Sequence, residues 1–284
     1  MLLSILKDSR DTPQRLSILQ ILQNFSGEDS LVEPMVALLK DSGPQIRQSA
    51  IGILANQGKE ATPHLVAALK DKDANVRYAA VLGLQRVPGD LKEALPALVP
   101  LLKEGDVWQR RIVIQTLGRV GEPAVAHLIP YLKDNDVNLR MATTDALRTI
   151  GPDAKKAIPT LMDMALNDGN PNVRHRAVWA VGQLEPDKIA DLFASVKKHK
   201  DERVRFSAYQ GLAQARLPAK TCLAPLMDGL QDSGWQSRRL CLLAIGNLGT
   251  DAKDAAPLVT KLLDDPQPAV RSMAKKVLAQ IQSK

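Results

Sequence analysis

The sequence predicts an all-helical protein, an α-solenoid of about nine helical hairpins, and two observations support this. A helix-like segment with the same pattern recurs at residues 71–87, 134–150, 168–184 and 264–281. An arginine also recurs in each copy at intervals of 30 to 34 residues. A fixed period of this length is typical of repeats that each form one small helical unit and bury their apolar faces against their neighbours. These marker arginines are Arg15, Arg47, Arg77, Arg110, Arg140, Arg174, Arg205, Arg238 and Arg271.

Nine copies leave no room for a separate domain, so we expect one repeat array over the whole chain. The expected units lie near residues 1–26, 30–58, 60–88, 90–121, 122–151, 152–185, 186–216, 217–249 and 250–284.

Proline marks the first helix of each unit, because it fits the first helical turn, where its missing N–H would be unpaired anyway. These helices are expected to start near Pro34, Pro63, Pro96, Pro159, Pro225 and Pro257. The second helix has its own start signal, an Asp or Asn four residues before the marker arginine, which suits an N-cap. The six caps are Asp11, Asp73, Asp106, Asp136, Asn170 and Asp201. Pro44, Pro171 and Pro268 come one residue after that position, and glycine commonly ends the helix, as at Gly121 and Gly151.

Composition excludes several classes of protein. Only 3% of the 284 residues are aromatic, so the core must consist mainly of Leu, Ala, Val and Ile. The net charge of +7 makes the chain mildly basic, which is compatible with an acidic partner or nucleic acid but requires neither. Cys222 and Cys241 are too few for a disulfide framework or a metal cluster and are expected to be small core hydrophobes in a reducing compartment. No apolar run is long enough for a membrane span, so we expect a cytoplasmic protein.

The repeated pattern, Asp followed by Val-Arg and then by Ala and Ala-Leu-Gly, resembles HEAT repeats. The similarity is to the short, phycobilisome-lyase-like subclass and covers roughly residues 1–284. It implies a ladder of Asp–Arg pairs between successive hairpins, with carboxylates at the ends of the first helices. The candidate carboxylates are Asp8, Asp41, Asp71, Asp134, Asp168, Asp232 and Asp264. The marker arginines are therefore expected to be structural.

Functional residues should lie where the copies differ. At about 100° per residue, positions one, five and eight after the arginine lie opposite the core-facing side of the second helix. The resemblance implies that this side lines the concave surface. The third of these positions is mostly small, as in Gly118, Gly182 and Gly246. Three of the nine aromatic residues, Tyr78, Trp179 and Phe206, fall in the first two.

These side chains predict an apolar groove with cationic edges, suited to an acidic peptide or protein. The expected partner-binding residues are Tyr78, Leu82, Arg111, Gln115, Met141, Asp145, Arg148, His175, Trp179, Phe206, Gln210, Arg239 and Leu243. The alternative is that some of them simply cover neighbouring helices. Trp108 and Trp235 are expected to pack against an adjoining turn instead.

The chain carries no recognisable catalytic motif, so it is not expected to be an enzyme and needs no cofactor or metal. Its four histidines are followed by Leu65, Leu128, Arg176 and Lys200, so the His-Glu pairs of the HEAT-like deoxyhypusine hydroxylases are absent. A second hypothesis is a nucleic-acid-binding protein, possibly like the HEAT-like DNA glycosylases of alkylation repair. The resemblance implies Trp, Asp and Arg in a basic cleft for these enzymes, and Trp179, Asp145 and Arg148 could be neighbours here. Bilin lyase activity has no support in any residue.

Two local features complete the sequence-based expectations. Residues 197–200, KKHK, replace the usual Lys-Asp between the helices of the seventh unit, which indicates a solvated turn or, alternatively, an anionic contact. At the N-terminus, Leu2, Leu3, Ile5 and Leu6 have no polar capping repeat, so terminal stacking or self-association is possible.

Overall fold

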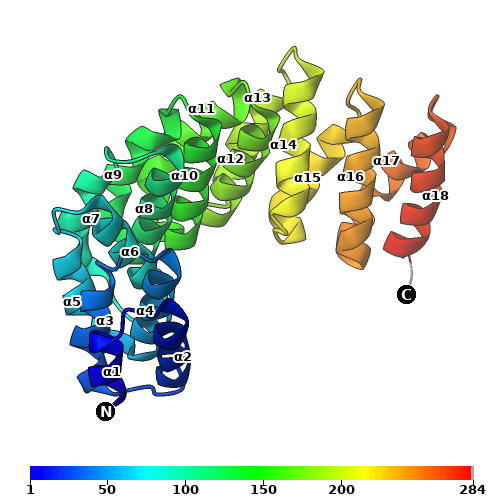
Figure 1. The fold of residues 1–284 in the computed structure, drawn as a ribbon. Coiled ribbons are helices and arrows are strands. Elements are labelled where there is room, and N and C mark those ends of the chain that lie inside the picture. Colours follow the sequence, from blue (N-terminus) through cyan, green and yellow to red (C-terminus); the bar gives the residue numbers. More distant parts are fainter. Residues whose placement is uncertain (283–284) are drawn as a thin grey trace. The chain divides into compact units, whose positions relative to one another are not determined.

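The computed structural model describes residues 1–282, and in that range the chain is helical and contains no strand. It forms two compact units, Met1–Pro130 and the remainder from Tyr131, which are described separately (Figure 1). The last predicted repeat reaches residues 283–284, which lie outside the described range.

The first unit contains four complete hairpins, in which a shorter first helix precedes a second helix. The second helices pack in sequence, α2 on α4, α4 on α6 and α6 on α8. The elements are α1 (Leu2–Asp8), α2 (Thr12–Leu22), η1 (Asp29–Leu31), α3 (Val32–Leu38), α4 (Pro44–Asn56), η2 (Gly58–Glu60), α5 (Ala61–Ala68), α6 (Ala74–Leu84), η3 (Lys92–Ala94), α7 (Leu95–Leu101), α8 (Val107–Val120), η4 (Glu122–Ala124) and α9 (Val125–Leu128). The 3₁₀ segment η5 (Ile129–Lys133) carries the boundary between the units.

The second unit repeats the arrangement, with α10 on α12, α12 on α14, α14 on α16 and α16 on α18. Its elements are α10 (Val137–Ile150), η6 (Gly151–Ala157), α11 (Ile158–Asn167), α12 (Pro171–Leu184), α13 (Lys188–Val196), α14 (Glu202–Gln214), α15 (Ala219–Gly229), α16 (Trp235–Leu248), η7 (Gly249–Ala255), α17 (Ala256–Lys261), η8 (Leu262–Asp264) and α18 (Pro268–Gln282). Each hairpin therefore buries its apolar stripe against the next one, as a repeat protein must.

Helix starts follow the sequence signals with one clear exception. The side chains of Asp73, Asp106, Asp136, Asn170 and Asp201 accept backbone N–H groups at the starts of their helices, whereas Asp11 occupies its cap position without such a bond. Pro225 does not start a helix, because α15 begins at Ala219 and Pro225 lies inside it. Proline is tolerated in the first turn of a helix but removes a backbone hydrogen bond further in. Pro100 in α7 is the other proline inside a first helix of the described chain.

The core is aliphatic, as the composition requires. The buried residues are mainly Leu, Ala, Val and Ile, and both cysteines are buried and free. Burial raises the pKa of each thiol, so neither is poised as a nucleophile. Among the residues described, the buried aromatics are Phe193 and Tyr209, whose ring centroids lie 5.5 Å apart.

The marker arginines bind the turns of their own hairpins, and the expected ladder of Asp–Arg pairs is present only in part, since Asp71 pairs with Lys40 and not with a marker arginine. Nη1 donates to the backbone carbonyls six and five residues earlier, which ties the second helix to the turn of its own hairpin. The arginines with both bonds are Arg47, Arg77, Arg140, Arg174, Arg205, Arg238 and Arg271.

Several marker arginines also bind a carboxylate of the following hairpin. Arg140 pairs with Asp168 at 2.8 Å and Arg205 with Asp232 at 2.7 Å. The prediction of Asp264 as a ladder residue is wrong by one position. Arg238 pairs with the buried Asp265 at 2.7 Å, and Asp264 is exposed at the end of η8.

Candidate functional site

The second helices expose one side, and all thirteen residues predicted for partner binding lie on it half-buried or exposed. We call this side the second-helix face and describe one patch in each unit. The first patch consists of Tyr78, Leu82, Trp108, Arg111 and Gln115 on α6 and α8. The second patch consists of Met141, Asp145, Arg148, His175, Arg176, Trp179, Phe206, Gln210, Arg239 and Leu243 on α10, α12, α14 and α16. The structure thus places these side chains away from the core, and their role in binding remains a prediction.

The third position of the expected outward side does not belong to this face. Gly118, Gly182 and Gly246 are buried, contrary to the prediction. Side chains of later segments lie over two of them, so an added Cβ at Gly182 would come within 2.9 Å of Leu217 Cδ1. At Gly246 it would come within 2.5 Å of Gln280 Oε1. Glycine therefore permits close packing at Gly182 and Gly246, whereas Arg148, at the same position of its helix, is half-buried.

The first patch is an aromatic pair beside a guanidinium. The rings of Tyr78 and Trp108 meet edge to face with centroids 5.9 Å apart, and the Arg111 guanidinium carbon lies 5.6 Å from the Trp108 ring centroid. Trp108 is 51% exposed. The prediction that Trp108 packs against an adjoining turn is therefore wrong. Its position at the start of α8 brings it over α6, and the helical spacing used for the sequence prediction could not reveal that contact.

Burial gives the Tyr78 hydroxyl unusual properties. Burial, and to a lesser degree the charge of Asp106, raise the pKa of Tyr78 to about 12. The hydroxyl oxygen is buried and has no hydrogen-bond partner within residues 1–282. A buried polar atom without a partner is costly, so this hydroxyl lowers the stability of the first patch.

The second patch combines a covered tryptophan with a small charge network. The Arg148 guanidinium carbon lies 4.2 Å from the Trp179 ring centroid, close enough for a cation–π contact. Asp145 lies 3.7 Å from Arg148 and also pairs with Arg176. The predicted proximity of Trp179, Asp145 and Arg148 is therefore confirmed. Arg176 was not predicted as a site residue, because it lies two positions after the marker arginine.

Open space adjoins the second patch. A hollow of about 750 Å³ is lined by residues that include Arg148, Trp179, Gln183, Arg216 and Asn247. Burial, together with the charge of Arg176, lowers the pKa of His175, so its imidazole is neutral at pH 7. Beyond these side chains, Leu243 and Arg239 on α16 are exposed. This part of the face can therefore accept both apolar and anionic groups.

No group of three or more His, Cys, Asp or Glu side chains within residues 1–282 is arranged to hold a metal ion. None of the helices in that range is both long and apolar enough to cross a bilayer.

Family comparison accounts for the whole array. The family model for HEAT repeats matches residues 1–85, 32–115, 62–148, 95–168, 158–228 and 223–284. The chain is a HEAT-repeat protein. No curated protein shows significant sequence similarity to it.

Solved structures share the fold at low sequence identity. The structure of the Escherichia coli protein YibA is 22% identical, with 95% of this chain and 98% of that chain covered, at a TM-score of 0.52. Two longer proteins are also similar. The karyopherin Kap121p, solved with the extreme C-terminus of the protein phosphatase Cdc14p, matches 99% of this chain and 37% of its own at 15% identity and a TM-score of 0.63. Kap95, in the Kap95:Nup1 complex, matches 99% of this chain and 44% of that chain at 11% identity and a TM-score of 0.67. These similarities support the α-solenoid fold.

Proposed function

We propose that this HEAT-repeat protein is a non-enzymatic scaffold that binds an acidic peptide or protein segment through the second-helix face of its units. One observation carries the proposal. Each unit exposes a tryptophan–arginine cluster on that face, although the chain has only three tryptophans. Trp, Tyr and Arg are the residues that most often dominate binding energy at protein interfaces.

The chemistry of the two patches specifies the partner further. Arg111, Arg148 and Arg239 provide cationic groups beside apolar surface from Trp108, Met141, Phe206 and Leu243. A segment that alternates apolar and acidic side chains would match this composition, and the net charge of +7 would favour its approach. The karyopherin structures that share the fold contain protein partners, which supports the same class of function by analogy.

The remaining parts of the proposal concern subclass and setting. The interval of 30 to 34 residues between marker arginines favours the short, phycobilisome-lyase-like subclass of HEAT repeats. Two free, buried cysteines favour a reducing compartment such as the cytoplasm. The proposal also includes self-association through the first hairpin, where the exposed side chain of Ile5 would contact a second copy.

The test compares proteins captured by the parent chain and by a Trp108→Ala, Trp179→Ala double variant. We expect a partner that binds the parent and is lost by the variant at unchanged helix content. Trp235→Ala is the matched control, because Trp235 is also exposed but lies at the start of α16, outside both patches. Equal capture by all three proteins would contradict the proposal.

A nucleic-acid function is the second candidate, because the structure brings Trp179, Asp145 and Arg148 together. In that function Trp179 would stack on a base and the arginines would contact phosphate. Asp145 is already paired with Arg148 and Arg176, however, which makes it a positioning group in this structure. Titration with random duplex DNA between low and high salt separates the two functions. A steep loss of affinity with salt, removed by Arg148→Gln, would favour DNA binding.

A further inference from the structure

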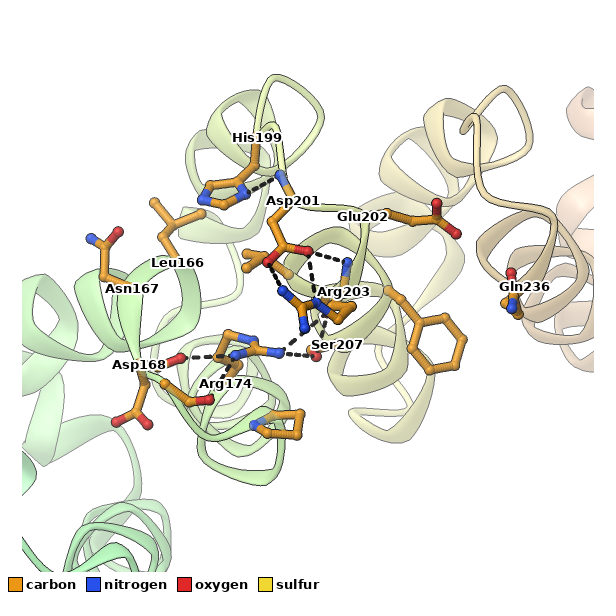
Figure 2. A pocket seen from close by; sticks show the side chains of 14 residues that line it. Leu166, Asn167, Asp168, Arg174, His199, Asp201, Glu202, Arg203, Ser207 and Gln236 are labelled. Atoms are coloured by element: carbon orange, nitrogen blue, oxygen red, sulfur yellow. Dashed lines mark hydrogen bonds and ion pairs between the residues drawn. The ribbon is translucent and has the colours of Figure 1, made fainter.

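The ladder of marker arginines is interrupted at Arg174 on α12. Arg140, Arg205 and Arg238 each bind an aspartate of the following hairpin through Nε and Nη2. In the hairpin that follows Arg174, the corresponding turn residue is His199. Figure 2 shows Arg174, His199 and the surrounding side chains of α12 and α14.

His199 performs only half of the function of the aspartate that it replaces. In the intact turns, Asp168 Oδ1 accepts the backbone N–H of Asn170 and Asp232 Oδ1 accepts that of Gly234, each at 2.8 Å. His199 Nδ1 accepts the N–H of Asp201 at 3.1 Å in the same way. A neutral imidazole has one acceptor nitrogen, whereas a carboxylate has two acceptor oxygens. His199 therefore holds the turn but has no acceptor left for Arg174.

Arg174 consequently has one donor atom, Nε, without a hydrogen-bond partner. Nη1 donates to Asp168 O at 2.9 Å, and Nη2 donates to Ser207 Oγ at 3.1 Å and more weakly to Arg203 O at 3.4 Å. Nε has no hydrogen-bond partner among the described residues, although Arg174 is only 6% exposed. In the rungs of Arg140, Arg205 and Arg238 this same atom binds an aspartate oxygen at 2.7 to 2.8 Å, whereas Arg15 binds Asp41 through Nη2 alone and also leaves Nε without a partner. A buried guanidinium without its anion is costly.

Two of the three acidic side chains that line the cavity are bound by other arginines, and the third, Glu202, is exposed. Asp168 is bound bidentately by Arg140, and Asp201 caps α14 and pairs with Arg203 at 3.1 Å. Burial lowers the pKa of Arg174, while the charges of Asp201 and Asp168 raise it. The guanidinium thus remains cationic with no carboxylate in direct contact among the described residues.

A cavity of about 750 Å³ adjoins this side chain. Its lining combines apolar surface from Leu166, Pro171 and Phe206 with the polar side chains of Ser207 and Gln236 and with five charged side chains, those of Arg174, Arg203, Asp168, Asp201 and Glu202 (Figure 2). The volume is larger than a single ion requires, and the lining is part polar and part apolar. It suits a carboxylate attached to an apolar or aromatic body.

We propose that this cavity binds a carboxylate, which completes the missing rung by accepting a hydrogen bond from Arg174 Nε. The carboxylate can belong to a small organic acid or to an acidic side chain of a partner, and an adjoining apolar group would lie against Phe206. The cavity shares Phe206 with the second patch, but the proposal rests on the interrupted ladder and not on the proposed peptide function.

The test uses two carboxylate probes, phenylacetate and the dipeptide acetyl-Phe-Asp-amide, each with its neutral counterpart, phenylacetamide and acetyl-Phe-Asn-amide. Binding to the full chain is followed by NMR titration. We expect at least one carboxylate to bind and its neutral amide to bind at least about tenfold more weakly. Binding of phenylacetate identifies a free acid as sufficient, and binding of the dipeptide alone identifies a peptide side chain as the source.

Three variants decide whether Arg174 is responsible. His199→Asp supplies the missing carboxylate within the chain, so it should raise the melting temperature and weaken probe binding at least about tenfold. Arg174→Gln should also abolish binding. Arg238→Gln is the matched control, because it breaks an intact rung and should lower stability while leaving probe affinity unchanged. If neither carboxylate binds, if the amides bind equally well, or if His199→Asp leaves affinity unchanged, the proposal is wrong. His199→Asp keeps this test decisive even if Arg174→Gln fails to fold.

Discussion

The two units use the same residue types on the second-helix face in different ways. In the first unit Trp108 is half exposed, with Arg111 at 5.6 Å and Tyr78 against its edge. In the second unit Arg148 covers the Trp179 ring at 4.2 Å and lies near Asp145. An uncovered ring offers apolar area to a partner, whereas a covered ring fixes a guanidinium in place. The first patch should therefore contribute mainly through apolar contact and the second through oriented charge together with its apolar neighbours.

The carboxylates that pair with the marker arginines also differ in burial between the two units. In the first unit Arg77 pairs with Glu104, whose side chain is 46% exposed. In the second unit the carboxylates are bound by two guanidinium nitrogens, and Asp232 and Asp265 are only 3% exposed. Hydrogen bonding to Arg238 lowers the pKa of Asp265 despite its burial, which by itself raises the pKa. Charge pairs in the second unit are therefore more strongly desolvated and should matter more for stability.

The largest expected effect on binding comes from the second patch. Trp179→Ala combined with Phe206→Ala should reduce affinity for a captured partner by roughly 3 kcal/mol, because two anchors are lost together. Both side chains are half-buried, so the melting temperature should change little. Titration calorimetry and thermal melts on the same samples measure the two quantities. A melting temperature far below that of the parent would show that these aromatics are core residues and that the face is assigned wrongly.

Trp108→Ala should have the next largest effect, a loss of roughly 2 kcal/mol in binding, with stability unchanged. The uncovered ring loses contact with the partner and little within the chain. Trp235→Ala provides the control for removing an exposed tryptophan. The contrast between the patches would fail if Trp108→Ala lowered stability instead of affinity.

The ladder variants compare the two units directly. Arg140→Ala should reduce the free energy of unfolding by roughly 1 to 3 kcal/mol, because it leaves the Asp168 carboxylate, 7% exposed, without its partner. Arg77→Ala should cost less than about 1 kcal/mol beyond the loss of its carbonyl bonds, since its partner Glu104 is largely solvated. The two variants are comparable, because each arginine donates hydrogen bonds to two backbone carbonyls of its own turn. Chemical denaturation measures the difference. Loss of partner binding at unchanged stability would instead make the ladder a ligand site.

Charge reversal should produce the smallest effect. Arg111→Glu in the first unit and Arg239→Glu in the second should each weaken an acidic partner by about 1 kcal/mol or less, mostly through a slower association rate. Arg239 is exposed and Arg111 is half-buried, so Arg111→Glu should also depend less on salt. Stopped-flow or surface-based kinetics at two salt concentrations would measure this. Faster association with the variants would exclude an acidic partner.

Sequence periodicity determined the repeat fold and the side of each second helix that faces away from the core. Both follow from local rules, since apolar spacing, N-cap residues and first-turn prolines act within a few residues of one another. The thirteen predicted face residues therefore all lie at half-buried or exposed positions. The prediction that a first helix starts near Pro225 was wrong, because a rule about one helical turn cannot determine where α15 begins.

Contacts between hairpins were decided only by the tertiary structure. The contact of Trp108 with Tyr78, the burial of Gly182 and Gly246, and the pairing of Arg238 with Asp265 instead of Asp264 all depend on residues 27 to 35 positions apart. The turn at KKHK was visible in the sequence, but the consequence for Arg174 was not. An unpaired guanidinium nitrogen depends on how two successive hairpins pack, and the period of a sequence carries no information about the atoms that meet across that packing.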